Sequence, residues 1–363
     1  MNPLILLSMV LFVVSPIWAA STADPHATTE ANALLDYLAR LSGQTTHKMI
    51  SGQAIWRDMV ADDAARAAKR PRPPFTYDLP QAIYTETGHY PGVLELMEPS
   101  GIEDSAAREL TLDHWNAGGI LISHILIGNM PEKWFGLGKV NLDTITSDPR
   151  YLAHLDKLVE NYLFYQSKGV VFIARPFLEM NGRWNWFYTT DYQQYKNLWV
   201  HFFTYMTSHG VHNLLYMYCP ASGFGTYLER YPGHQYVDVV GLDSYFILGD
   251  QPYQDGGTID GYDVMIATGK PFGIGEYGPF GTEPLPLTYQ SYDARLLLQG
   301  LKQNMPQIVF VTHWAPPFDL MHMSNVSAYM NDPYVQNRPI PFKLMPGAVG
   351  KTTPTPPSDT QTN

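Results

Sequence analysis

The sequence predicts an α/β protein made of one (β/α)8 TIM barrel, with extended loops at the C-terminal face of the strands. Two observations lead to this fold. Eight short β-rich runs recur along the chain, and helical patterns follow them. Alternating strand and helix signals indicate a parallel sheet. Eight such alternations favour a closed barrel over a doubly wound sheet, which is the lesser alternative.

The predicted strands are short runs bounded by helical or loop segments. They cover residues 48–53, 92–97, 119–123, 170–175, 214–218, 237–242, 271–275 and 308–313. In a barrel of this kind the active site gathers on the loops that follow the strand C-termini. Residues just beyond each predicted strand are therefore the first candidates for function.

Two of the connecting helices carry their own boundary signals. Asp148 is suited to cap a helix whose first residue is Pro149, and Gly169 closes the same segment. Between them, apolar residues recur on one face over 152–162. A second helical pattern covers residues 195–206. Both segments fit helices that cross between parallel strands.

Both ends of the chain are expected to lie outside the barrel domain, which we place at residues 30–344. Residues 1–20 hold no charged side chain and are mainly apolar, which is typical of a secretory signal peptide. A retained membrane anchor is the alternative, because Lys and Arg are missing and Pro16 interrupts the run. Residues 345–363 are Pro/Thr-rich and are predicted to form a disordered tail. We therefore expect a secreted or periplasmic protein that is free of the membrane once the signal is removed.

Composition limits the classes of partner. With 13% aromatic residues and a formal net charge of −11, the chain has no electrostatic footprint for nucleic acid or for an anionic membrane. Neutral ligands that stack on aromatic rings fit better, and sugars are the commonest of these outside the cell. The single cysteine, Cys219, rules out an internal disulfide and is predicted to be a small buried residue.

Two glutamates follow predicted strands. Glu179 lies just beyond the fourth and Glu276 just beyond the seventh, so both are expected on the same rim. Two carboxylates in one pocket supply the proton donor and the anion that break a glycosidic bond, and a separation of about 5 to 5.5 Å would mean retention of configuration. The alternative for either glutamate is a solvated loop residue. Asp243, after the sixth strand, is predicted instead to pair with an arginine such as Arg175.

Aromatic residues cluster near these acids. Trp184 and Trp186 follow Glu179, and Trp314 lies beyond the eighth strand. Flat aromatic faces suit the C–H faces of pyranose rings. The alternative is that these rings cap the barrel core.

At these residues the chain resembles the retaining (β/α)8 glycosidases of clan A, and most specifically glycoside hydrolase family 26, the β-mannanase family. The family pattern around the acid/base is Arg-Pro-aromatic-His-Glu-x-Asn-Gly followed by Trp-x-Trp. This chain matches the pattern from Arg175 to Trp186, except that Leu178 replaces the histidine. The resemblance extends over about residues 51–314, which is nearly the whole chain expected after removal of the signal peptide.

The resemblance implies a role for each matching residue. Glu179 would be the acid/base, Glu276 the nucleophile, and Tyr245 the tyrosine that hydrogen-bonds the nucleophile. The residues expected to contact sugar are His124, Asn181, Trp184, Trp186 and Trp314.

The leading hypothesis is thus a secreted retaining endo-β-glycosidase that acts on a β-1,4-linked neutral polysaccharide, with mannan first. Leu178 favours a bacterial exopolysaccharide or another β-glycan as the alternative substrate. A non-catalytic glycan-binding barrel is a further alternative. Sugar identity, linkage, endo or exo action and oligomeric state stay open at this stage.

No cofactor and no metal are expected. A metal-dependent barrel hydrolase is the competing class, because His89, His114, His124, His313 and Asp243 could meet on one rim. Against it, no His-x-His follows the first strand and no His-Glu-x-x-His occurs, so the spacings of a built metal site are missing.

Overall fold

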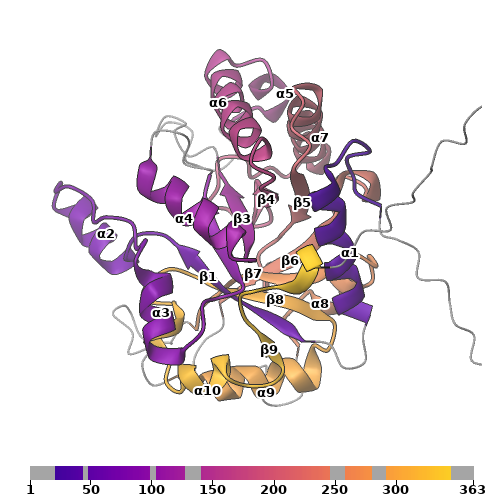
Figure 1. Ribbon diagram of the computed structural model, residues 1–363. Helices are drawn as coiled ribbons and strands as arrows, with labels where there is room; N and C mark the ends of the chain where they lie inside the picture. The colour runs from indigo at the N-terminus through magenta and orange to yellow at the C-terminus, as the bar shows by residue number, and fades with distance from the viewer. Residues whose placement is uncertain are drawn as a thin grey trace, which may run out of the picture.

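The structure is a computed structural model that describes residues 21–43, 48–98, 104–126, 140–245, 258–279 and 292–344; the predicted leader and tail lie outside these ranges. Eight parallel strands close into a barrel, because β1 pairs with both β2 and β8 (Figure 1). The strands are β1 Met49–Ile55, β2 Val93–Met97, β3 Ile120–Ile125, β4 Phe172–Pro176, β5 Leu214–Tyr218, β6 Val239–Ser244, β7 Phe272–Tyr277 and β8 Ile308–His313.

The barrel prediction is confirmed, and each predicted strand is present within two residues of its expected ends. Closure through the β1–β2 pairing excludes the doubly wound alternative. One strand of the described residues was not predicted. The two-residue strand β9, Val335–Gln336, pairs with the start of β1 at Met49 and Ile50. Two residues are too short to show a sequence period.

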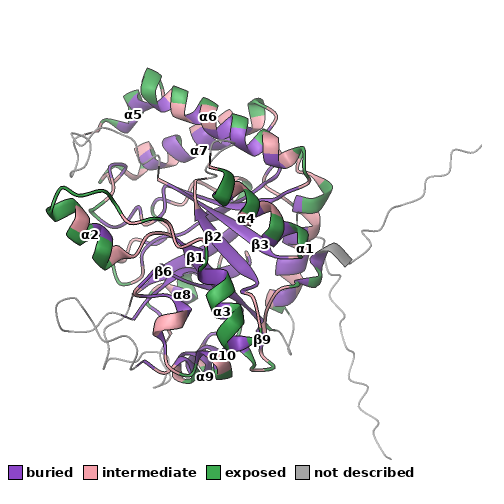
Figure 2. Cartoon of the chain, turned by 60° about the vertical axis from the view of Figure 1, so that its left-hand side comes forward, coloured by how far each residue is buried: buried purple, intermediate pink, exposed green. Residues whose placement is uncertain are grey.

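Helices surround the barrel and turn their exposed faces outward (Figure 2). They are α1 Thr29–Gly43, α2 Met59–Ala67, α3 Leu79–Thr87, α4 Ser105–Asn116, α5 Leu142–Ile145, α6 Pro149–Gln166, α7 Tyr192–Ser208, α8 Tyr262–Ile266, α9 Ala294–Asn304 and α10 Val326–Met330, with short 3-10 turns at His234–Tyr236, Leu320–His322 and Pro341–Leu344. The predicted start of α6 is confirmed, since the Asp148 side chain accepts a hydrogen bond from the backbone N–H of Arg150. Gly169, with φ 70°, then turns the chain toward β4.

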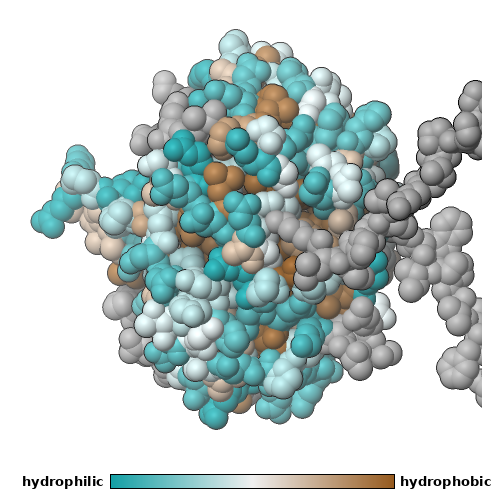
Figure 3. All heavy atoms as spheres, in the orientation of Figure 1, coloured by the Kyte–Doolittle hydropathy of each residue, from teal (hydrophilic) through white to brown (hydrophobic). Residues whose placement is uncertain are grey.

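The strands are buried at nearly every position, so the barrel interior and the layer beneath the helices form one apolar core. Figure 3 shows the outer face in the view of Figure 1, where hydrophilic side chains cover most of the surface and hydrophobic ones fill smaller patches between them. Among the helices that the structure describes, none is both long and apolar enough for a membrane crossing.

The segment before α1 is attached to the barrel by polar contacts. The backbone N–H of Ala23 donates to Asp238 Oδ1 at 2.6 Å, and Asp24 Oδ2 lies 2.7 Å from Nδ1 of His212. Asp238 also accepts a hydrogen bond from the N–H of Tyr216 on β5. These contacts make the chain from about residue 22 onward part of the folded domain.

Candidate active site

A cavity of about 560 Å³ opens at the C-terminal ends of the strands. Its charged lining consists of Glu179, Asp243, Glu276 and His124. Its aromatic lining consists of Trp56, Trp184, Phe224, Tyr245, Trp314 and Phe318. The cavity thus combines a compact ionic floor with broad apolar walls, which is the composition expected of a site for a ring-shaped ligand with hydroxyl groups.

The two glutamates meet in this cavity. Glu276 is the last residue but one of β7, and Glu179 follows the end of β4. One carboxylate oxygen from each of Glu179, Asp243 and Glu276 lies within 4.8 Å of the other two. So short a separation matches the closely spaced pair of a retaining glycosidase, about 5 to 5.5 Å, rather than the about 6.5 to 9.5 Å of an inverting one.

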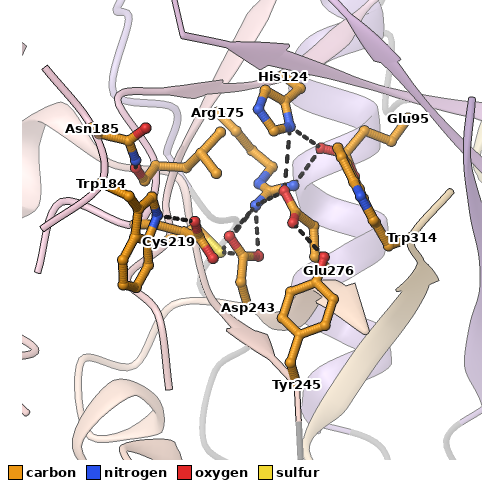
Figure 4. Close-up of polar contacts among 12 residues, drawn as sticks. Glu95, His124, Arg175, Trp184, Asn185, Cys219, Asp243, Tyr245, Glu276 and Trp314 are labelled. Carbon is orange, nitrogen blue, oxygen red and sulfur yellow. Dashed lines mark hydrogen bonds and ion pairs between the residues drawn. The ribbon is translucent and has the colours of Figure 1, made fainter. Parts of the chain in front are cut away.

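Glu276 is surrounded by donors and positive charge (Figure 4). Tyr245 O–H donates to Oε2 at 2.8 Å, while Arg175 Nη2 and His124 Nδ1 each lie 3.3 Å from Oε1. Burial alone would raise the pKa of Glu276. The hydrogen bonds and charges of its three neighbours outweigh burial and lower that pKa below its usual value. Glu276 is therefore suited to be the ionised member of the pair.

Glu179 has the opposite surroundings. Burial raises its pKa to about 7, and the nearby charge of Glu276 adds to the rise. Three side chains oppose this rise: Trp184 Nε1–H donates to Oε2 at 2.6 Å, and Arg175 and His124 contribute positive charge. Leu178 also lines the cavity beside this acid and offers no polar atom from its side chain. Glu179 is therefore suited to carry a proton near neutral pH.

Arg175 organises the floor of the site. It projects from β4, is fully buried, and its Nη2 donates to Asp243 Oδ1 and Oδ2 at 2.5 and 2.6 Å. The predicted pairing of Asp243 with Arg175 is confirmed. The second terminal nitrogen of the guanidinium, Nη1, donates a hydrogen bond to Oε1 of Glu95 on β2. Gly275 makes room for this pair, because a Cβ there would stand 2.6 Å from Asp243 Oδ1 and 2.8 Å from Arg175 Cζ.

His124 links the floor to the cavity. Burial lowers its pKa, but Glu276 and Glu95, each 3.3 Å from Nδ1, raise it to about 9. The imidazole is therefore charged at neutral pH. Its Nε2 has no protein partner within the described part of the chain, although the ring borders the cavity. Trp314 packs beside the ring at 5.4 Å between centroids.

Two expected sugar contacts are not placed at the cavity. Asn181 directs its amide to the backbone after β5, donating to the carbonyls of Ala221 and Gly225 and accepting from the N–H of Ala221. Trp186 is 3% exposed and donates Nε1–H to the carbonyl of Leu126. Neither residue is among those that line the cavity, so their substrate contacts stay a prediction that this geometry does not support. Both instead hold the loop that carries Glu179.

Trp184 and Trp314 do border the cavity, as predicted. Sequence reasoning missed Trp56 and Met59 after β1 and Phe224 after β5, which complete the walls. Their only signal was an aromatic or long apolar residue shortly after a strand. Cys219 is buried as predicted, with its thiol donating to Asp243 Oδ1 at 3.2 Å.

The histidines of the competing metal hypothesis do not converge. His89 contacts Asn331, His114 contacts the carbonyl of Gly92, and His313 is buried in the core. Two acid-rich groups, Glu95–His124–Glu276 and Glu179–Asp243–Glu276, have atoms close enough for a cation. However, the guanidinium of Arg175 already contacts three of these carboxylates. The donor set therefore fits a site neutralised by arginine better than a metal centre.

Comparison with known proteins gives consistent results. The model of Glycosyl hydrolase family 26 matches residues 23–339. The mannan endo-1,4-beta-mannosidase of Bacillus subtilis strain 168 is 27% identical over 345 residues, covering 88% of this chain and 88% of that protein. Among solved structures, the YdhT protein from Bacillus subtilis aligns with a TM-score of 0.72 and 24% identity over 88% of this chain and 96% of that one. Bacillus subtilis mannanase man26 aligns with a TM-score of 0.70 and 24% identity over 88% and 95%.

Proposed function

The chain belongs to glycosyl hydrolase family 26 and is a glycoside hydrolase, and from this membership and the cavity we propose an endo-β-1,4-mannanase that retains anomeric configuration. The observation that carries the mechanism is a pair of carboxylates within 4.8 Å whose pKa values are displaced in opposite directions. Such a pair supplies one acid and one nucleophile at the same pH.

In the first step, Glu276 attacks the anomeric carbon of the bound sugar. A bond forms between its carboxylate oxygen and C1 while the C1–O glycosidic bond breaks. The electron pair of the broken bond stays with the leaving oxygen, which takes the proton of Glu179. The product is a covalent glycosyl ester of Glu276, and Glu179 is left as a carboxylate.

In the second step, the ionised Glu179 acts as a base. It removes a proton from water, whose oxygen attacks C1 from the face that the leaving group vacated. The ester bond to Glu276 breaks, and its electron pair returns to the carboxylate. Two inversions give overall retention, and both glutamates recover their starting protonation states.

Neighbouring groups have separate proposed tasks. Tyr245 orients Glu276 by its hydrogen bond, and the Arg175 network keeps that carboxylate ionised. His124 directs its unpaired Nε2–H at a sugar hydroxyl, and Trp314 provides a flat surface beside it. Because the leaving group departs on the side of Glu179, Trp184 and Phe224 border the half of the substrate that is released first.

Hydrolysis of defined β-linked polysaccharides tests this proposal. Mannan, glucomannan, β-glucans and xylan are incubated with the purified chain, and the products are resolved by size and by proton NMR of the first anomer formed. We expect mid-length β-configured fragments from mannan. Monosaccharide alone would contradict endo action, the α-anomer would contradict retention, and binding without turnover would favour a non-catalytic barrel.

A second substrate class is favoured by Leu178. This side chain lines the cavity next to Glu179, where the family pattern has a histidine donor. Losing a donor there alters recognition at the cleavage site, so another β-glycan or a bacterial exopolysaccharide is the alternative substrate. Faster hydrolysis of such a glycan than of mannan in the same screen would select it.

Export is also part of the proposal, with residues 1–20 as a cleaved leader. The charge-free apolar run supports it, and the folded domain begins directly afterwards with the contacts of Ala23 and Asp24. Expression of the full chain in a secreting bacterium, followed by N-terminal sequencing, should give a new terminus between Ala20 and Ala23. An intact leader on membrane-bound protein would instead identify an anchor.

A further inference from the structure

Trp184, on the acid side of the site, makes a hydrogen bond to Glu179 in addition to offering a ring on which a sugar can stack. Trp184 is 45% exposed, yet its single polar side-chain atom points inward, with Nε1 at 2.6 Å from Oε2 of Glu179. Within the described residues, no other side chain donates a hydrogen bond to this carboxyl group. A large ring thus remains at the surface while its N–H is committed to Glu179.

The loop is shaped to allow this placement. A Cβ on Gly182 would stand 2.2 Å from Cζ2 and 2.5 Å from Cε2 of Trp184, so the indole lies directly across the glycine. The N–H of Gly182 donates to the carbonyl of Glu179 at 2.9 Å, which closes the turn between them. Phe224 contacts the indole edge-on at 4.9 Å between centroids. The ring is therefore held both by the turn and by a neighbour after β5.

The chemistry of the indole makes the contact directional. An indole N–H donates and cannot accept, so Oε2 has to be an acceptor in this contact. A protonated carboxyl group accepts best through the oxygen that lacks the proton. The proton of Glu179 is therefore carried on Oε1.

We propose that Trp184 is a positioning residue for the general acid, whose N–H holds Oε2 of Glu179 so that the transferable proton stands on Oε1. This inference rests on the proposed function, because it assigns the proton that the leaving oxygen receives. The same bond stabilises the carboxylate that forms when the proton departs, so Glu179 becomes a stronger acid without losing its orientation.

Other charged groups also act on Glu179, and a test has to leave them in place. Glu276 faces it from β7, Asp243 from β6, Arg175 from β4 and His124 from β3. Because these four side chains are unchanged by a replacement at position 184, a difference between variant and parent isolates the indole.

The first test is Trp184→Phe, which keeps an aromatic ring and removes the N–H. We expect the basic limb of the kcat/KM pH profile to shift to higher pH by about one unit, because the pKa of Glu179 rises when this hydrogen bond is lost. We also expect kcat on polysaccharide to fall about tenfold at the optimum. A residue that only stacks on sugar would change KM at every pH and leave the limb in place, and that result would overturn the proposal.

A second variant tests the same hydrogen bond by adding a Cβ beneath the indole. Gly182→Ala keeps Trp184 but forces the indole off its position, so the same upward shift of the limb is expected. Trp56→Leu is the matched control, because it removes an aromatic ring of the cavity wall that packs on Phe75 and not on Trp184. It is expected to change KM and not the limb. A limb shift in the control equal to that in Trp184→Phe would contradict the role of the hydrogen bond.

Direct titration makes the result independent of turnover. The carboxyl carbon of Glu179 is followed by NMR in protein labelled with carbon-13 glutamate, and its signal is assigned by its loss in Glu179→Gln. The midpoint should rise by about one pH unit in Trp184→Phe and in Gly182→Ala. Unchanged or lowered midpoints would overturn the inference, even if the parent hydrolyses mannan. A parent that hydrolyses no β-glycan would overturn the proposed function and leave this measurement to decide on the bond.

Discussion

The ends of β4 and β7 carry the same residue type in contrasting surroundings. At β7, Glu276 is buried among a phenol, a guanidinium and an imidazolium. At β4, Glu179 has an apolar neighbour in Leu178 and one weakly acidic donor in Trp184. Two free glutamates would have the same pKa, but the neighbours of these two shift their pKa values in opposite directions. The difference indicates that the proposed roles of acid and nucleophile arise from the surroundings of each carboxyl group and not from the residue type.

The backbones of the two ends differ as well. Glu276 lies within a strand, whereas Phe177 and Glu179 adopt left-handed φ values of 50° and 54°. Such values cost roughly 1 to 2 kcal/mol for each non-glycine residue. The N–H of Glu179 donates to the carbonyl of Cys219 at 2.8 Å, which helps to hold the turn. The loop after β4 therefore has a strained backbone at the residue proposed as the acid, and the end of β7 does not.

The largest expected effect comes from Glu276→Ala at the β7 end. We expect kcat to fall about a thousandfold or more, because the group that bonds C1 is lost. Added azide should restore turnover and yield a glycosyl azide of inverted configuration, as seen by NMR. A product of retained configuration would assign the nucleophile to another residue.

Glu179→Ala should give the next largest effect, and one that depends on the leaving group. Polysaccharide hydrolysis is expected to fall by about 10²- to 10⁴-fold, because the leaving oxygen has to be protonated. Formation of the glycosyl ester from an aryl glycoside with an acidic phenol should change little. Pre-steady-state bursts with a series of phenols measure this step. Equal losses over the whole series would contradict the assignment of the acid.

Tyr245→Phe sharpens the comparison by weakening only the β7 network. The parent needs Glu276 ionised and Glu179 protonated, so its kcat/KM should rise along an acid limb and fall above about pH 7. Removing the phenol raises the pKa of Glu276, so the acid limb should move up by about one pH unit while kcat falls about tenfold. A shift of the basic limb instead would mean that Tyr245 acts on the pKa of Glu179 and not on that of Glu276.

The smallest effect is on stability. The raised pKa of Glu179 means that its protonated form stabilises the fold below the unfolded value of about 4.3, and that this stability is lost as pH rises toward about 7. Glu179→Gln should therefore raise Tm by about 2 °C at pH 8 and leave it unchanged at pH 4. Calorimetry at both pH values measures the difference. A Tm gain of the same size at both pH values would mean that the effect does not come from the ionisation of Glu179.

The fold could be predicted because its signals are local. Each barrel strand is a short β-rich run, and Asp148 and Pro149 mark the start of α6 within one turn. The positions of Glu179 and Glu276 followed from barrel geometry, since every strand ends on one rim. The directions of side chains were less accessible. Asn181 and Trp186 match a motif by residue type, yet both turn toward the backbone of neighbouring loops.

Partners from remote strands were the hardest to foresee. Glu95 has the sequence context of an ordinary residue inside β2, but it bonds Arg175 from β4 and lies beside His124 from β3. Phe224 and Trp56 reach the cavity from loops far apart in the chain. No window of sequence contains these pairs, so no periodic pattern predicts them.

By itself, the sequence determined the strand and helix order and the placement of two carboxylates on a common rim, because these depend on residues close together in the chain. The family resemblance had assigned the acid/base role to Glu179 and the nucleophile role to Glu276, but the physical reason why one carboxyl group favours the ionised form and the other the protonated form lies in the tertiary structure. This difference depends on burial and on charges brought from β3, β4, β6 and β7, and these exist only once the barrel has closed.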